Sequence, residues 1–416
     1  MPALKRHRRP PAAGRSARPR GAVALVTVLL LCALALLASL HAHRALLAEL
    51  RGARVQQRSA QAHEAAESGL QWALAQLNAG RLDGACAPSS DAGAQRLRER
   101  LIFSLAGLRL SPASEADGQP SRAGCTLDAD GAWACACGGS GAPASALETP
   151  SFSVQVAAGP RADLMALRSR GCLGCGEGEL DAQAPAEWLL ALVPAITGLP
   201  AAPLTVRGTV RLPGFNLRLS TRERDAQGLL LHAGGVVDAS SLQPGEDRAQ
   251  TLRLVAERDP ELARLSAGRL LHRHLGLDPL DLARAPGMQI VRCDGDCADA
   301  LRTAVDRGAQ ALWVDGDLSL PAGLTLGSVD APVLLAVQGA ARLGPGVRLH
   351  GLLAAASLQW HARPGGDFIR GAVLVDGDCC EGSGAPALER DAALLRRLAR
   401  QAGRFVAVPG SWKDFE

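Results

Sequence analysis

The chain has 416 residues, of which 47% are hydrophobic and 21% are charged, and its formal net charge is +4. Seven of the 45 basic side chains lie in the first twenty residues, so the remaining 38 face 41 acidic ones. The excess positive charge is therefore a property of a short leader, and it does not indicate nucleic-acid binding. The length beyond the first helix allows one large domain or two small ones.

The N-terminus has the pattern of a membrane anchor. A basic leader, residues 1–21, precedes nineteen uncharged residues, Ala22–Leu40. About twenty apolar residues span a bilayer as a helix, whereas the apolar part of a secretory signal has roughly 7–15. The basic leader predicts a cytoplasmic N-terminus and places the rest outside the inner membrane, with a cleaved secretory signal as the alternative. The side chains expected to face lipid include Ala22, Leu25, Leu29, Leu36 and Leu40.

The helix is expected to continue well past the membrane, because no proline occurs between Pro19 and Pro88. We predict one helix over 22–78, ended by Asn78-Ala79-Gly80. Its second half carries an apolar stripe at the three-to-four spacing of a helix face. The stripe consists of Ala62, Ala65, Ala66, Gly69, Leu70, Ala73, Leu74 and Leu77. We expect this face to lie against a globular region.

Residues 79–305 are predicted to form a mixed α/β periplasmic region. A hairpin is expected over 125–137, turning at Asp130-Gly131, because Asp-Gly between alternating residues is a hairpin signal. Further strands are predicted at 151–157, 164–170, 204–212, 216–220 and 228–232. Helices are predicted at 94–105, 184–195, 260–275 and 297–307.

Residues 306–385 contain a coarse repeat. Shifting the chain by 23 residues aligns Leu320 with Leu343 and Leu326 with Leu349, and the segment 366–378 follows at a shift of about 20. Short apolar strands separated by glycine turns at this period predict a small β-solenoid, in which each coil covers the edge of the last. A helix over about 388–401 and a tail complete the last segment, 386–416. The fold class expected for the whole chain is α+β.

Eleven cysteines are present, and Cys32 lies within the apolar run. An even number beyond the membrane is typical of disulfides in an oxidising compartment. These ten are Cys86, Cys125, Cys135, Cys137, Cys172, Cys175, Cys293, Cys297, Cys379 and Cys380. Their pairing does not follow from the sequence; our guesses are 86 with 125, 172 with 175 and 293 with 297. The adjacent residues 379 and 380 are expected to pair elsewhere, with a strained bond to each other as the alternative.

Other motifs favour structural roles. Cys172-x-x-Cys175 has the spacing of a redox-active pair or of half a zinc site, but a zinc site needs a second pair, and none with like spacing is present. Asp-Gly-Asp recurs at Asp294, Asp315 and Asp376; calcium binding is the alternative to the tight turns that Asp-Gly favours. We see no catalytic constellation, and expect no metal, no cofactor and no enzymatic activity.

The N-terminal residues resemble a known family. Arg20-Gly21-Ala22, followed by Leu25-Val26 and a Leu/Ala run, is similar to the start of PilX-type minor pilins of type IV pili, and HEAAESGLQWALAQLN (63–78) resembles that family's helix motif. Four later segments resemble a subset with β-rich extensions: WACAC, RGCLGC, WVDGDLSLP and PGSWKDF.

The resemblance implies cleavage by prepilin peptidase after Gly21, with Ala22 as the methylated mature N-terminus. It also implies other minor pilins, a major pilin and a pilus tip adhesin as partners. Major pilins carry a glutamate at the fifth mature position, where this chain has Val26. A buried carboxylate at that position needs a partner, such as the amine of the neighbouring subunit. This chain lacks the carboxylate and cannot make that pairing. A subunit at the filament tip does not need the pairing, so Val26 suggests a position at the tip.

Two alternatives stay open. A K-type pseudopilin of type II secretion also lacks the glutamate and caps a tip, although the repeat and the PGSWKDF tail argue against it. A membrane-tethered β-helix enzyme acting on polysaccharide is the alternative from a different class.

Overall fold

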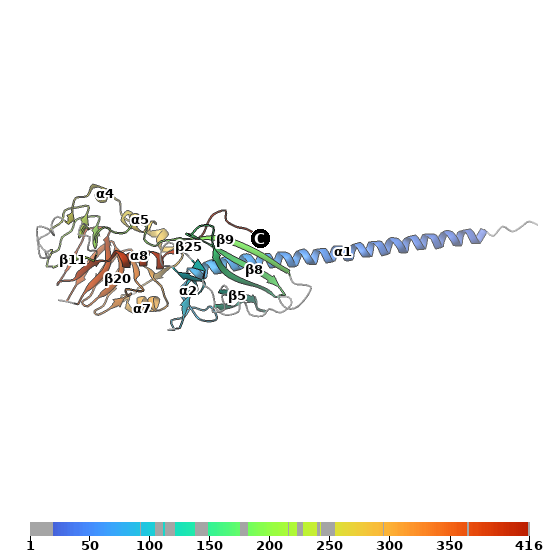
Figure 1. Ribbon diagram of the computed structural model, residues 1–416, viewed down its shortest axis with the longest axis horizontal. Helices are drawn as coiled ribbons and strands as arrows, with labels where there is room; N and C mark the ends of the chain where they lie inside the picture. Colours follow the sequence, from blue (N-terminus) through green and yellow to red (C-terminus); the bar gives the residue numbers. More distant parts are fainter. Residues whose placement is uncertain are drawn as a thin grey trace, which may run out of the picture. The chain divides into compact units, whose positions relative to one another are not determined.

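The computed structural model describes residues 20–91, 93–104, 111–112, 121–137, 149–174, 182–214, 216–222, 228–238, 242, 254–293, 295–363 and 366–414. The chain forms two compact units, Met1–Arg58 and Ser59–Glu416. The fold is a long apolar helix followed by a β-rich region with several sheets, which confirms the predicted α+β class at this level (Figure 1).

The predicted long helix is observed as α1, Arg20–Leu77. Its last turns belong to the second unit and bury one face, with Ala62, Ala66, Leu70, Ala73 and Leu77 fully buried. These are members of the predicted apolar stripe, so the three-to-four spacing identified the buried face correctly.

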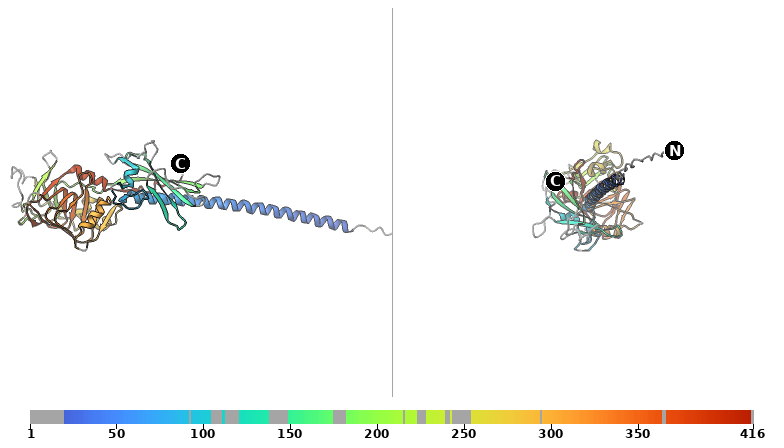
Figure 2. Two further views of the ribbon diagram at one scale, coloured as in Figure 1. Left: turned by 90° about the horizontal axis from the view of Figure 1, so that it is seen from below. Right: turned by 90° about the vertical axis from the view of Figure 1, so that its right-hand side faces the viewer.

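The buried face of α1 packs on a six-stranded antiparallel sheet with the order β25-β9-β8-β7-β5-β6 (Figure 2). Its strands are β5 (Arg122–Leu127), β6 (Trp133–Cys137), β7 (Pro150–Ala158), β8 (Leu164–Leu173), β9 (Ala182–Val193) and β25 (Arg404–Ala407). The helix stripe meets Phe152, Val154, Leu167, Leu190 and Phe405 in one core. The predicted hairpin and the predicted strands at 151–157 and 164–170 are confirmed.

The helix predicted at 184–195 is wrong, since this stretch is strand β9. It pairs with β8 along its length and with β25 near its end, and this pairing overrides a weak helical pattern. Pro185 is tolerated because β25 reaches only Leu190–Val193, which leaves Pro185 without a second neighbouring strand in the described part of the chain.

The helix predicted at 94–105 is also mostly wrong. Only α2, Leu97–Leu101, is helical. On either side the backbone pairs with other segments, as β2 (Gln95–Arg96) with β1 (Arg81–Leu82) and as β3 (Ile102–Ser104) with β4 (Ser111–Pro112). Residue 105 lies outside the described residues.

The remaining strands form two parallel sheets, called here the parallel stack. The larger sheet contains β10 (Leu204–Val206), β11 (Arg218–Thr221), β12 (Leu231–Ala233), β13 (Val255–Ala256), β14 (Met288–Val291), β15 (Ala311–Val314), β17 (Thr325–Leu326), β18 (Val333–Val337), β20 (Arg348–Ala355), β22 (Phe368–Val375) and β24 (Ala387–Arg390). The smaller sheet contains β16 (Leu318–Leu320), β19 (Ala340–Leu343), β21 (Ser357–His361) and β23 (Glu381–Ser383).

The predicted repeat register is observed. Leu320 pairs with Leu343 and Leu326 with Leu349, a shift of 23 residues, and Arg348 pairs with Phe368, a shift of 20. Apolar side chains from both sheets fill the space between them, including Leu320, Leu353 and Trp360.

The stack is closed by strands that are distant in sequence. The order β13-β12-β10-β22-β20-β18-β15-β14 places β10 beside β22, with Leu204 opposite Val373. After β13 the chain passes through α4 (Pro260–Ala263), α5 (Arg269–Leu275) and α6 (Pro279–Ala283) to β14 at the other end of the sheet. It then returns strand by strand to β22.

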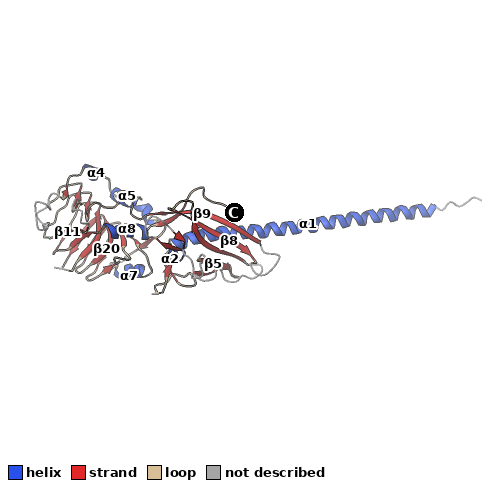
Figure 3. Ribbon diagram, viewed as in Figure 1, coloured by secondary structure: helices blue, strands red, loops and turns tan. Residues whose placement is uncertain are grey.

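Helices cover the outer face of the larger sheet (Figure 3). Leu270 of α5 and Leu398 of α8 (Ala392–Gln401) pack with Leu334 and Leu374. The predicted helix at 297–307 is observed as α7 (Ala298–Asp306).

Two other helix predictions need correction. The predicted helix at 260–275 is split into α4, which ends at Ala263, and α5, which begins after Gly268; the φ of +82 at Gly268 is a left-handed conformation that does not fit within a continuous helix. The helix predicted from 388 begins at Ala392, because Ala387–Arg390 pairs as β24 with β22.

Asp391 connects α8 to the stack, and we predict that its removal destabilises the fold. Its carboxylate accepts a 2.9 Å bond from the Leu394 N–H as the helix N-cap and two bonds, of 2.8 and 2.7 Å, from the Arg370 guanidinium. Asp391→Ala should lower the free energy of unfolding by about 2–4 kcal/mol, because it removes a cap and leaves the largely buried Arg370 with only a 3.9 Å contact to Glu389. Denaturant unfolding of the full chain in detergent measures this change.

Asp163 supplies the matched control, because its carboxylate pairs with Arg161 on the surface, where ion pairs contribute little. Asp163→Ala should leave the free energy of unfolding unchanged.

Burial opposes ionisation of Asp391, but the bonds from Leu394 and Arg370 hold its pKa below the ordinary value. Ionised Asp391 should therefore contribute to the free energy of unfolding at any pH above the pKa that this carboxyl has in the unfolded chain. That contribution should be lost as the pH falls through the lower pKa of the folded chain. A wild-type chain and an Asp391→Ala chain with equal stability at neutral pH would contradict the assignment.

Candidate functional site

The predicted membrane segment lies in the first part of α1 and is exposed in this structure. Leu25, Leu29, Leu36 and Leu40 are 65%, 60%, 68% and 55% exposed. The most apolar 18-residue window of the helix has a mean hydropathy of 2.4, and none of it is buried. This helix is long and apolar enough to span a membrane. Gly21 and Ala22 lie in the first turn of the same helix.

Where α1 meets the sheet, two glycines allow close contact. Gly171 of β8 lies against the backbone of Ala62 and Ala66, so a Cβ at position 171 would collide with the helix itself. Gly69 on the helix lies against the Ser169 hydroxyl and the Phe152 ring. Trp72 also packs on Phe152, with ring centroids 5.6 Å apart. The apolar helix is thus fixed to the sheet through backbone contact that only small residues permit.

The disulfides confirm one of the guessed pairs and correct another. Cys293 pairs with Cys297 as predicted. Cys125 pairs with Cys135, because the hairpin places these residues directly opposite each other. Cys86 therefore pairs with Cys137 instead of Cys125, and the Cys137 N–H bonds the Gly84 carbonyl nearby.

The adjacent cysteines also differ from expectation, since Cys379 and Cys380 are bonded to each other. Both are buried where β10 meets β22, and their N–H groups bond the carbonyls of Thr209 and Arg211. Cys172 is disulfide-bonded, and its predicted partner Cys175 lies outside the described residues. Disulfides at these positions indicate that this region lies outside the cytoplasm.

The Asp-Gly-Asp motifs serve the turns of the stack. Asp317 Oδ1 accepts a 2.9 Å bond from the Ala340 N–H of the next coil, and Asp378 Oδ1 accepts a 2.7 Å bond from Thr209 N–H. Asp376 bonds the Gly268 N–H and the Arg207 guanidinium. Asp294 lies outside the described residues. Within the described ranges, no group of three or more His, Cys, Asp or Glu side chains is arranged to hold a metal ion.

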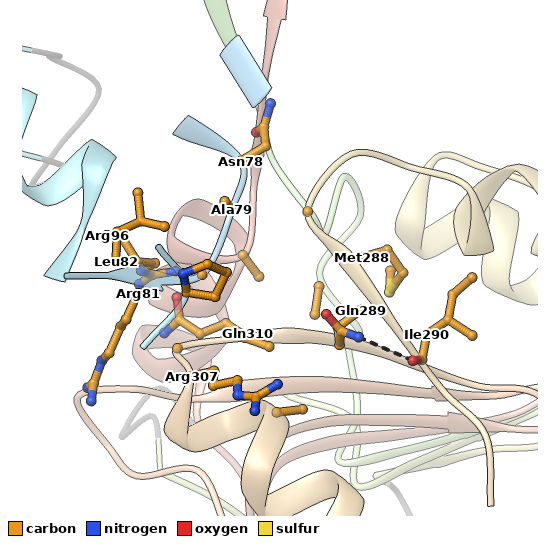
Figure 4. Close-up of a pocket in the computed structure, with 18 of the residues that line it drawn as sticks. Asn78, Ala79, Arg81, Leu82, Arg96, Met288, Gln289, Ile290, Arg307 and Gln310 are labelled. Carbon is orange, nitrogen blue, oxygen red and sulfur yellow. Dashed lines mark hydrogen bonds between the residues drawn. The ribbon is translucent and has the colours of Figure 1, made fainter. Parts of the chain in front are cut away.

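A cavity of about 700 Å³ lies between the end of α1 and β14, the strand at the edge of the larger parallel sheet (Figure 4). One wall is formed by residues 76–82 and part of 86–98, another by β14 and residue 292, and a third by α7 and residues 307–311. Residues 401–403 complete the lining. This volume is in the range of typical ligand sites.

The cavity lining is strongly cationic. It contains five arginines, and none of the described residues that line it is Asp or Glu. The arginines are Arg81, Arg96, Arg98, Arg292 and Arg307. They come from four separate parts of the chain and form no sequence motif. The sequence therefore did not predict this site.

Comparisons with known proteins add no identification: no family model, no curated protein and no solved structure matches this chain.

We predict that Gly171→Ala weakens the packing of α1 against the sheet. The new methyl group would meet the backbone of α1, which cannot move aside as a flexible side chain can. A loss of about 1–3 kcal/mol in unfolding free energy is expected, as for other overpacked sites. Gly84→Ala is the control, because nothing lies within 4 Å of a Cβ at position 84. Equal unfolding midpoints for the two variants would refute the close contact.

Proposed function

We propose that this protein is a minor pilin-like subunit of a type IV pilus that primes or caps filament assembly at the tip. The observation that carries the proposal is the division of α1 into two parts. Its first part exposes an apolar surface suited to lipid or to other helices, and its last part is buried against an antiparallel sheet. The basic leader and the residues that resemble PilX-type minor pilins support the same reading.

Assembly would proceed by helix packing. In the inner membrane, the exposed leucines of α1 contact lipid. After prepilin peptidase removes residues 1–21, the seven basic side chains that hold the N-terminus in the cytoplasm are gone. The helix can then pack with the helices of other minor pilins and the major pilin, where burial contributes about 25 cal/mol per Å² of apolar surface.

Val26 supports a position at the tip. It is 54% exposed on the apolar part of α1 and carries no charge. A carboxylate at this position of a major pilin is expected to pair with the N-terminal amine of a neighbouring subunit. Val26 offers no such pairing, so the chain is suited to a site with no subunit above it. The parallel stack, which we interpret as a short β-solenoid, would present surfaces to partners such as a tip adhesin.

A K-type pseudopilin of type II secretion is the second candidate, and the same Val26 favours it equally. The two candidates share processing at Gly21 and differ in the machine that the subunit joins. Deleting the assembly platform of the type IV pilus in one strain and that of type II secretion in another separates the two candidates. The subunit should no longer be detected outside the cell in the strain that lacks its own machine.

The mature N-terminus in the native host tests the shared part of the proposal. We expect it to be methylated Ala22, and to revert to an uncleaved leader when prepilin peptidase is deleted. Gly21→Leu should block cleavage by adding a side chain at the scissile bond, whereas Gly14→Leu in the leader should not. Mass spectrometry of the N-terminal peptide reports all four cases. A start at Met1, or at a residue beyond Leu40, would overturn the proposal.

The tip position has a separate test. Val26→Glu should increase the number of copies per filament, because the new carboxylate can pair with the N-terminal amine of an adjacent subunit. Val28→Glu is the matched control, since Val28 is similarly exposed at 56% but lies two residues away, on another side of the helix. Quantitative mass spectrometry against the major pilin measures the copy number. Wild-type protein present in many copies along the shaft would count against the tip assignment.

A further inference from the structure

The arginines around the cavity of Figure 4 are only partly neutralised. Arg96 pairs with Glu99 at 2.9 Å, and the largely exposed Arg292 lies 3.7 Å from Asp315. The Arg81 guanidinium donates to the Asp306 carbonyl at 3.5 Å. The Arg307 side chain, at the end of α7, has no carboxylate within ion-pair distance among the described residues. The cavity therefore has an excess of positive charge.

Arg98 makes this excess costly. It is 3% exposed, and its guanidinium donates to the carbonyls of Leu77, Gln401 and Gly403 at 2.8–3.0 Å. Burial lowers its pKa to about 9, the charge of Arg96 adds to this effect, and the charge of Glu99 opposes it in part. A buried cation that a nearby carboxylate compensates only in part is unfavourable, so an anion in the cavity would stabilise this arrangement.

The same cavity contains the free edge of a sheet. Strand β14 is the last strand of the larger parallel sheet, and in the described part of the chain it pairs with β15 alone. The Val291 carbonyl bonds the Asp315 N–H on the β15 side. Because backbone groups alternate along a strand, those of Ile290 are directed to the open side. Within the described residues, the Ile290 carbonyl there accepts only a 3.3 Å bond from the neighbouring Gln289 side chain (Figure 4).

We propose that this cavity binds an extended acidic segment of a partner protein, which adds as a strand to β14 while its carboxylates pair with the arginines. Strand addition satisfies the open backbone groups of an edge, and guanidinium groups bind carboxylates with two parallel bonds. The half-buried Met288 and the exposed Ile290 offer apolar contacts to the side chains between the carboxylates. This inference does not depend on the pilus role proposed above.

A free anion such as phosphate is the simpler occupant, and it is less well matched to the site. It could bind one or two guanidinium groups, but it would leave the edge of β14 unpaired. The cations are also contributed by separate segments around the cavity, which suits several carboxylates on one chain better than a single compact charge. The two occupants are separated by the experiment below.

The test measures binding of a labelled nine-residue peptide of alternating Asp and Val to the full chain in non-ionic detergent, by fluorescence anisotropy. We expect saturable binding that weakens as salt rises. Arg307→Gln should weaken binding by about tenfold, the effect of losing one charge-assisted pair. Arg302→Gln is the matched control: it lies on the same helix α7, pairs with Asp299, and does not line the cavity. It should bind as the wild type does.

Two further probes separate strand addition from plain charge attraction. The same peptide with alternate backbone nitrogens methylated retains its charge and cannot pair along β14, so it should bind at least tenfold more weakly. Inorganic phosphate should compete only at concentrations where general salt does. The proposal is overturned if the peptide fails to bind, if the methylated peptide binds equally well, if phosphate alone displaces the peptide specifically, or if Arg302→Gln and Arg307→Gln weaken binding alike. Because the protein variants change one exposed arginine each, none requires refolding of the core.

Discussion

The Asn78 side chain joins the end of α1 to the C-terminal strand β25, and this junction positions the helix on the sheet of the second unit. Its side-chain amide donates to the Leu74 carbonyl, which satisfies the end of α1, and to the Phe405 carbonyl of β25 at 2.9 Å. Its side-chain oxygen accepts the Phe405 N–H at 2.8 Å. One side chain thus ends the helix and holds the C-terminal strand in the sheet. Phe405 is buried in the core beneath α1, so a residue near the end of the chain completes the surface on which the helix rests.

The same place defines one wall of the cavity. Arg98 bonds the Leu77 carbonyl beside Asn78, and its guanidinium lies 5.2 Å from the centre of the Phe405 ring. The buried cation is therefore held by the carbonyls at the helix end, by the segment after α8 and by an aromatic face. Its position is a consequence of how α1 and β25 meet, so this junction places one of the five arginines of the cavity.

Closure of the parallel stack is a second long-range constraint. β10 pairs with a strand that comes more than 160 residues later, through Leu204–Val206 against Val373–Val375. The Thr209 N–H bond to Asp378 extends this contact into the turns. Pairing of distant segments is slow, because the intervening chain loses its freedom before the contact is formed. The stack cannot be completed until β22 has been made, although its coils from β15 to β20 are local and can form in sequence.

The sequence by itself determined the features that depend on local periodicity. The helix from Ala22, its buried stripe, the 125–137 hairpin and the 23- and 20-residue registers of the stack were predicted because each arises from residues close together in the chain. The Cys293–Cys297 disulfide belongs to the same group. Only the tertiary structure decided the strand at 182–193, the pairing of Cys86 with Cys137 and the five arginines of the cavity. In each of these, partners distant in sequence meet through sheet pairing or packing, and a local pattern contains no information on which distant residue will be the neighbour.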